Sequence, residues 1–253
     1  MAVNIDTVYQ RVLAIANKEQ RGYITPQEFN LFANQAQMNI FEQYFYDLNQ
    51  FGRLPGNDSD YADAVTILEE KIALFEFNAD PGYINAQNGF TLAGSATGFR
   101  LPPEEVYRLG TVRLNNVDVD VLTTKDFKLA IRTPLGQPTL DRPIAHRTGE
   151  YISIAYNVSG NGTLTYARPH LAGSPAISMD YIRRPSTAIW GYNVIQEKAM
   201  YEPSNSNNFD LHPSEEVELV NKILILAGIT IKSTELYQAA VAEDTKNLTQ
   251  EKR

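Results

Sequence analysis

The chain is 253 residues long, with 43% hydrophobic and 21% charged residues, so it can build a full hydrophobic core as one large domain or two small ones. Its 30 acidic residues outnumber its 22 basic residues and give a net charge of −8, which argues against a protein that grips duplex DNA through a basic face. The absence of cysteine excludes disulfides, thiolate nucleophiles and cysteine metal ligands. No signal peptide or membrane span is evident, so we expect a soluble protein made inside a cell, with no membrane partner.

Two helices are predicted at the start of the chain. Apolar residues recur at helical spacing after residues 6–7, either of which we expect to cap the first helix. A second helix has a stronger start signal, because Thr25 can cap it, Pro26 suits its first turn, and Glu28 stands three residues after the cap. This long helix is expected to end at Gly52.

Three more helices are predicted from similar signals. One begins after residues 57–60 and fades near residues 80–82. Another begins after the cap-and-proline pattern of residues 212–215 and ends at Gly228, and the last begins at about Ser233. None of these amphipathic helices can bury its apolar stripe alone, so we expect them to pack together.

In the middle of the chain the apolar period changes to two, which indicates β-strands. Residues 112–121 predict a hairpin whose turn is Asn115 and Asn116, two residues that tolerate positive φ. Residues 150–166 predict a second hairpin, and residues 178–183 a further strand. The glycines and prolines between these runs are typical of an antiparallel β region.

The order of segments predicts an α+β fold, in which N- and C-terminal helices form a bundle and an antiparallel β domain is inserted between them. Residues 1–80 are assigned to the first part of the bundle and residues 81–185 to the β domain. Residues 186–211 are predicted to be a long ordered excursion, since they contain several aromatic residues. Residues 212–253 complete the bundle and end in a flexible tail.

The long second helix carries two apolar faces. The members of one stripe are Phe29, Phe32, Ala33, Ala36, Ile40 and Tyr44. Leu31, Met38 and Phe45 recur every seven residues on nearly the opposite side. A surface helix normally has one apolar stripe, so a second stripe needs a second partner. That partner is either another helix of the same bundle or a neighbouring subunit, and both alternatives stay open.

No pattern in the sequence favours catalysis or metal binding. The histidines His146, His170 and His212 lie on separate segments and have no metal-ligand spacing. Residues 116–120 mimic the opening of a calcium loop, but the glycine and glutamate that such a loop needs later are missing. We therefore expect a protein that is not an enzyme and has no cofactor and no metal site.

Basic residues form only two noticeable clusters, residues 142–147 and the pair Arg183 and Arg184, and each fits an ion-paired or subunit-contact loop better than a nucleic-acid site. The candidate subunit interface consists of Leu31, Met38, Phe45, Trp190, Arg183 and Arg184.

Three short motifs follow one another along the chain: residues 101–109, which lead into the hairpin at 115–116, residues 180–185, and residues 211–216. Each motif is weak alone, but together they span most of the chain. In this order they resemble the head–tail adaptor or ring proteins of short-tailed bacteriophages, a group that includes the tail tubular protein A group and the ring proteins of crAss-like phages.

The resemblance implies a structural virion protein, assembled in the host cytoplasm, that forms a homo-oligomeric ring, commonly of twelve copies. The implied partners are the portal protein on one side of the ring and tail or nozzle proteins on the other. DNA would pass through the channel without specific binding. An acidic or neutral channel would suit this passage, because it repels phosphates.

A different class of function is a tail accessory or receptor-binding module. In that case the β region would present Tyr151, Tyr156 and Tyr166 to a carbohydrate, although alternating tyrosines in a strand are also typical of half-buried sheet residues.

Overall fold

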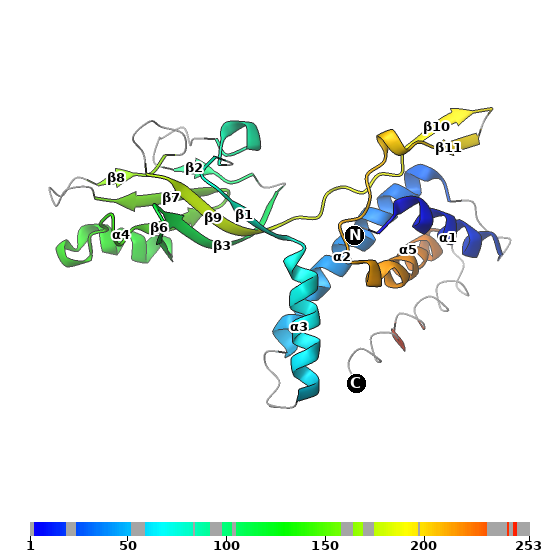
Figure 1. Cartoon of the computed structure of the whole chain (residues 1–253), viewed down its shortest axis with the longest axis horizontal. Coiled ribbons are helices and arrows are strands. Elements are labelled where there is room, and N and C mark those ends of the chain that lie inside the picture. The colour runs from blue at the N-terminus through cyan, green and yellow to red at the C-terminus, as the bar shows by residue number, and fades with distance from the viewer. Residues whose placement is uncertain are drawn as a thin grey trace. The chain divides into compact units, whose positions relative to one another are not determined.

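The structure is a computed structural model, and it divides into two compact units (Figure 1). Residues 1–74 and 185–253 form the helical unit, and residues 75–184 form the β unit. The residues that the structure describes are 3–18, 24–51, 59–82, 84–91, 98–102, 105–157, 164–168, 175–196, 198–231, 242, 245 and 246. Over these ranges the chain has five α-helices and three mainly antiparallel sheets, so the α+β class predicted from the sequence is confirmed.

Four of the helices belong to the helical unit. They are α1 (Ile5–Lys18), α2 (Pro26–Phe51), α3 (Ser59–Ala73) and α5 (Glu216–Ile231). Helix α5 packs against both α1 and α2, and α3 packs against α2. The main apolar stripe of α2 lies in this core: its buried members are Phe29, Ala33, Ala36, Ile40 and Tyr44.

Local hydrogen bonds explain where the first two helices begin. The backbone N–H of Thr25 donates to Glu28 Oε2 at 3.0 Å, and the N–H of Glu28 donates back to Thr25 Oγ1 at 3.3 Å, which confirms the predicted capping box. The N–H of Thr25, together with its hydroxyl, which also donates to Glu28 Oε2, lowers the pKa of Glu28. The cap of α1 is instead Asn4, whose Oδ1 accepts from the N–H groups of Asp6 and Thr7, so the prediction that residue 6 or 7 caps this helix was wrong.

Two helix ends differ from the prediction. Helix α3 ends at Ala73, and the residues expected to continue it form strand β1 (Glu76–Ala79), which pairs with β9 (Ile177–Arg183). Helix α5 runs through Gly228 instead of ending there, because its apolar packing outweighs the cost of glycine in a helix, about 1 kcal/mol. The predicted last helix lies outside the described residues, apart from residues 242, 245 and 246.

The first sheet of the β unit has the order β1–β9–β3–β4 and is antiparallel throughout. Strand β3 (Val106–Leu114) turns into β4 (Val117–Asp118) through Asn115 and Asn116, whose φ angles are 50° and 65°. The predicted asparagine turn is therefore confirmed.

The second sheet has the order β2–β7–β6–β5, and β8 pairs with β7. Its strands are β2 (Phe99–Arg100), β5 (Asp120–Leu122), β6 (Ile144–Thr148), β7 (Tyr151–Tyr156) and β8 (Thr165–Tyr166). Strands β5 and β6 are parallel, and helix α4 (Thr124–Arg132) joins them. Neither this helix nor a parallel pair of strands was predicted from the sequence, which indicated an antiparallel region only. Parallel neighbouring strands need a crossover connection, and α4 supplies it.

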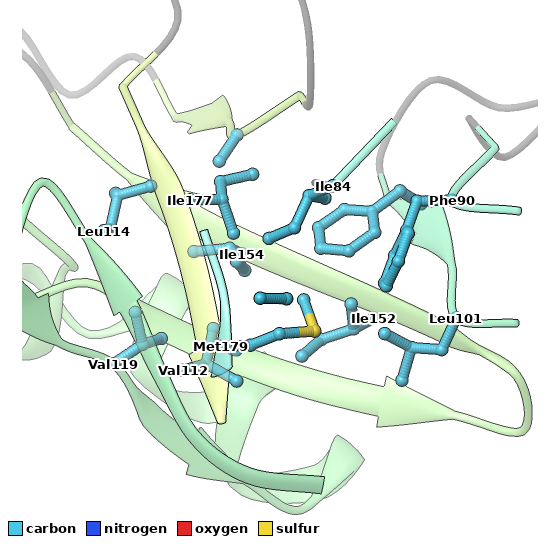
Figure 2. Close-up of a cluster of buried hydrophobic side chains, with 14 of the residues drawn as sticks. Ile84, Phe90, Leu101, Val112, Leu114, Val119, Ile152, Ile154, Ile177 and Met179 are labelled. Carbon is cyan, nitrogen blue, oxygen red and sulfur yellow. The ribbon is translucent and has the colours of Figure 1, made fainter. Parts of the chain in front are cut away.

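A hydrophobic core lies between the two sheets (Figure 2). Val112, Leu114 and Met179 reach it from the first sheet, and Ile152 and Ile154 from the second. Helix α4 covers the other side of the second sheet, where a smaller cluster consists of Phe127, Ile144 and Ala155. The β unit therefore has three layers, two sheets and one helix.

The segment from Pro185 to Leu211 belongs to the helical unit and contains a third sheet. This sheet is the hairpin of β10 (Tyr192–Ile195) and β11 (Lys198–Tyr201), within the region predicted from the sequence to be a long ordered excursion, for which no strands were predicted. The units divide at Phe75 and Pro185, whereas the sequence-based assignment placed the β domain at residues 81–185. Within the described ranges, no helix has the length and apolar character that crossing a bilayer requires.

Candidate subunit-contact site

Amide side chains of α2 hold the extended segment that precedes the hairpin. Asn34 Nδ2 donates to the carbonyl oxygen of Ala188 at 2.9 Å, and its Oδ1 accepts from the N–H of Ala188 at 2.9 Å. Asn30 makes the same two bonds with the backbone of Trp190, at 3.3 Å and 2.8 Å. Each amide satisfies both polar groups of a buried residue, as a neighbouring strand would.

Gln37 extends this pattern by one helical turn. Its Nε2 donates to the carbonyl oxygen of Ser186 at 2.8 Å, and its Oε1 accepts from the N–H of Asp210 at 3.3 Å. The N–H of Ser186 donates to Asp210 Oδ2 at 2.7 Å. The three amides stand at positions i, i+4 and i+7 of α2 and contact every second residue of the segment, so we call them the amide ladder. It fixes the base of the hairpin on α2.

Trp190, which the sequence placed at a subunit interface, lies instead in the core of the helical unit. It is 2% exposed, and its Nε1 donates to Asp6 Oδ1 at 3.0 Å. Its ring centroid lies 4.3 Å from that of Tyr9 and 5.8 Å from those of Tyr192 and Tyr201. Trp190 therefore anchors the hairpin to α1 and is not available as a surface contact.

The predicted second stripe of α2 is exposed to different degrees. Leu31 is 71% exposed, whereas Met38 and Phe45 are half-buried. The ring of Phe45 lies against that of Phe41, with 5.1 Å between their centroids. Tyr46 is exposed on the same side of the helix as Leu31. The outward face of α2 thus has two exposed apolar side chains, Leu31 and Tyr46, while Met38 and Phe45 on the same side are partly covered.

The hairpin carries a second exposed apolar surface. Val194, Ile195 and Met200 are all exposed, and Figure 1 shows the hairpin reaching beyond α1 and α2. Strand alternation places Val194 on one face of the hairpin and Ile195 and Met200 on the other. Two strands alone are marginally stable in water, and these apolar side chains have little cover from the rest of the described unit. This surface was not predicted from the sequence, although the alternation from Tyr192 to Ile195 was a usable signal.

Arg183 is the last residue of strand β9, and Arg184 follows it directly. The N–H of Arg183 donates to the carbonyl oxygen of Phe75 at 2.7 Å, and the N–H of Arg184 donates to that of Glu105 at 2.9 Å. The side chain of Arg183 is half-buried and that of Arg184 is exposed. Their backbones therefore complete the first sheet, and Arg184 keeps its charged group at the surface.

A group of charged side chains is buried where α2, α3 and α5 meet. Glu215 is 3% exposed, and the Nζ of Lys71 lies 2.6 Å from its Oε1. Lys222 Nζ lies 3.2 Å from Glu218 Oε1 and donates to Gln43 Oε1 at 3.2 Å. Burial raises the pKa of Glu218 to about 7; Glu215 adds to the shift and Lys222 opposes it. These side chains connect α2, α3 and α5.

The tyrosines of the alternative carbohydrate site do not share one surface. Tyr151 and Tyr156 are five residues apart in β7, so they point to opposite faces of the sheet. Tyr156 is buried, which raises the pKa of its hydroxyl, and Tyr166 is half-buried opposite Ala155. Tyr151 alone is exposed, so these three residues offer no continuous aromatic platform.

The histidines are also separate in space where the structure describes them. The ring of His146 packs on Phe127 with 4.2 Å between centroids, and burial, followed by the charge of Lys128, lowers its pKa. The Nδ1 of His212 accepts from the N–H of Ser214 and caps the turn before α5. His170 lies outside the described residues. Among the residues that the structure describes, no group of three or more His, Asp or Glu side chains could hold a metal ion.

No protein-family model matches this chain, and a search of curated proteins finds no match. The functional assignment therefore depends on the two exposed apolar surfaces of the helical unit and on the sequence resemblance.

Proposed function

We propose that the chain is a structural, non-catalytic virion protein that forms the ring connecting the portal of a short-tailed bacteriophage to its tail. The ring is homo-oligomeric, with twelve copies as the expected number, and DNA passes through its channel. Portal and tail or nozzle proteins are the proposed partners on either side.

One observation supports self-assembly most directly. The helical unit exposes apolar side chains at two separate places: Leu31 and Tyr46 lie about 22 Å apart on one side of α2, and the hairpin exposes Ile195 and Met200 on one face and Val194 on the other. A ring contact is heterologous, so each subunit needs two different surfaces that complement each other. Neighbouring exposed apolar side chains such as Ile195 and Met200 are typical of an interaction surface.

The rigidity of the hairpin base also suits this role. The amide ladder and the aromatic packing of Trp190 hold the hairpin in a fixed position relative to α2. Pre-ordered surfaces lose less conformational entropy on association than mobile ones do. In our proposal α1, α2, α3 and α5 form the bundle that carries both surfaces, and the β unit is an insertion in it.

Assembly is tested by placing charge on each apolar surface. Leu31→Glu changes only the exposed residue of the α2 stripe, and Ile195→Glu with Met200→Glu changes the hairpin. Both variants should keep the circular dichroism spectrum and unfolding transition of the wild type, but sediment as monomers where the wild type forms large assemblies. Val121→Glu, at another exposed apolar position in the β unit, is the matched control and should assemble normally. Assembly of both test variants at wild-type concentrations would contradict the proposal that these surfaces join subunits.

A further inference from the structure

Charge is distributed unequally between the two units. Residues 75–184 contain 10 acidic and 11 basic residues, a net charge of +1, whereas the remainder of the chain contains 20 acidic and 11 basic residues, a net charge of −9. All of the net negative charge of the protein therefore belongs to the helical unit, and the β unit is nearly neutral. A local group of cations on the β unit of one copy can therefore attract the helical unit of another.

Helix α4 concentrates the positive charge of the β unit on its outer face. Phe127 and Ile131 face the second sheet, so the opposite face points away from it. Leu129, 63% exposed, stands on this outer face. The cations around Leu129 are Lys125, Lys128 and Arg132, all exposed and none with an ion-pair partner among the described residues.

Helix α3 has an outer face of the opposite charge. Leu68 and Ile72 are buried, whereas Thr66, Glu70 and Ala73 on the far side of the helix are exposed. Ile67 is 52% exposed, and Leu74, in the turn just after the helix, is also exposed. Glu70, three residues after Ile67, is exposed beside it, and Glu69 is exposed on the adjoining side of the helix; neither makes an ion pair within the described ranges. An exposed apolar residue with carboxylates nearby on α3 thus matches an apolar residue flanked by cations on α4.

We propose that helix α4 of one copy docks against helix α3 of a second copy, with Leu129 packed near Ile67 and the cations of α4 paired with Glu69 and Glu70. This inference depends on the proposed self-assembly and adds its direction. The apolar surfaces of the helical unit supply attraction, and the charged helices determine which surface meets which. Because α3 and α4 are different surfaces, the contact repeats head to tail, as ring formation requires.

A second copy fits the outer face of α4 better than a nucleic acid does. Phosphate groups would pair with Lys125 and Arg132, but a phosphate backbone offers no apolar partner to the exposed Leu129 between them. The outer face of α3 offers both carboxylates and apolar side chains. We therefore favour a second copy as the partner of α4, and the experiment below also measures binding of a duplex oligonucleotide.

Charge reversal separates these possibilities. One variant carries Lys125→Glu and Arg132→Glu, and the other carries Glu69→Lys and Glu70→Lys. Each variant alone brings like charges together at every junction, so its self-association should weaken by at least about 100-fold. A 1:1 mixture places opposite charges at every junction when the two variants alternate. The mixture should therefore regain wild-type assembly with equal amounts of both variants, measured by mass photometry and native mass spectrometry.

Two controls make the result decisive. Arg142→Glu with Arg147→Glu changes the net charge by the same amount as the α4 variant but leaves the outer face of α4 intact, and it should assemble as the wild type does. A single chain with all four reversals on α3 and α4 should also assemble.

Several results would overturn the inference. Assembly of either charge-reversed variant alone at wild-type concentrations would exclude the α3–α4 contact and leave the proposed ring standing. Failure of the mixture to assemble would also overturn it, as would loss of duplex-oligonucleotide binding in the α4 variant with assembly unchanged. A wild-type chain that is monomeric at every concentration would contradict both the inference and the proposed function.

Discussion

The side chain of Asn34 in α2 replaces a neighbouring strand for Ala188. Its amide donates to the carbonyl oxygen of Ala188 and accepts from the N–H of Ala188, both at 2.9 Å. Ala188 is fully buried, so water cannot take over these bonds. The long segment between the β unit and α5 is ordered at this point because a helix supplies its hydrogen bonds through side chains.

Asn34→Ala should lower the free energy of unfolding by about 2–4 kcal/mol, because it leaves the N–H and the C=O of Ala188 buried without partners. Urea unfolding measures this change. Asn39→Ala is the control, since Asn39 is an exposed residue of α2 whose Oδ1 accepts from Gln35, and it should cost less than about 0.5 kcal/mol. Equal losses in the two variants would show that the amide ladder is not important for stability.

Lys71 and Glu215 should depend on each other for stability. Lys71→Met removes the cation 2.6 Å from a carboxylate that is almost completely buried, and should cost about 3 kcal/mol. Adding Glu215→Gln to this variant removes the uncompensated charge and should restore much of the loss. Chemical denaturation of the two single variants and the double variant gives the coupling energy. Additive losses would contradict the buried ion pair.

Glu218 should make the helical unit less stable as the pH rises. Burial raises the pKa of its carboxyl group to about 7 in the folded state, from an ordinary value of 4.5. Between these values the folded chain binds more protons than the unfolded chain, so the contribution of this group to stability falls as the pH rises, and it is constant above about 7. Glu218→Gln should therefore stabilise the protein by about 1–2 kcal/mol at about pH 8 and have little effect at about pH 4.

This pH dependence is measured by urea unfolding of the wild type and Glu218→Gln at both pH values. Glu42→Gln, at an exposed position of α2, is the control and should behave like the wild type at both. A Glu218→Gln variant that is less stable than the wild type at high pH would show that the attraction to Lys222 outweighs the cost of burial.

The turn between β3 and β4 should prefer residues that tolerate positive φ. Asn116 has a φ of 65°, so Asn116→Gly should stabilise the hairpin slightly, by about 0.5 kcal/mol. Asn116→Val should destabilise the protein by about 1–2 kcal/mol, because a β-branched side chain is strained in this conformation. Asn115 is left unchanged because its Oδ1 accepts from the N–H of Ala176. Thermal unfolding ranks the variants, and a valine variant as stable as the wild type would contradict this interpretation.

Signals that act over a few residues were predictable from the sequence. The capping box of Thr25 and Glu28 and the asparagine turn at 115–116 follow from short-range hydrogen bonds and backbone preference, and both are confirmed. The cap–proline pattern at His212 also marks a turn before α5. Helix ends were less predictable, since the tertiary packing of α5 carries it past Gly228.

Features that depend on distant partners were missed. In the sequence, the amide ladder of Asn30, Asn34 and Gln37 is typical of a solvent-exposed polar helix face. Its role depends on the distant segment 186–190, which packs against it in the fold. Helix α4 had a usable sequence signal, because Thr123 stands three residues before Asp126 and caps the helix by accepting from its N–H. The segments on either side of it in the sequence indicated only strands. Trp190 was placed on the surface because its partners lie far away in the sequence, in α1 and the hairpin.

The most direct test of the proposed function is the mass and shape of the purified wild-type chain, measured by mass photometry and negative-stain electron microscopy, alone and with a portal protein. Ring formation predicts closed particles with one defined number of copies, near twelve, and a central channel. Monomers under both conditions, with the exposed residues of α2 and the hairpin still accessible to solvent, would contradict it.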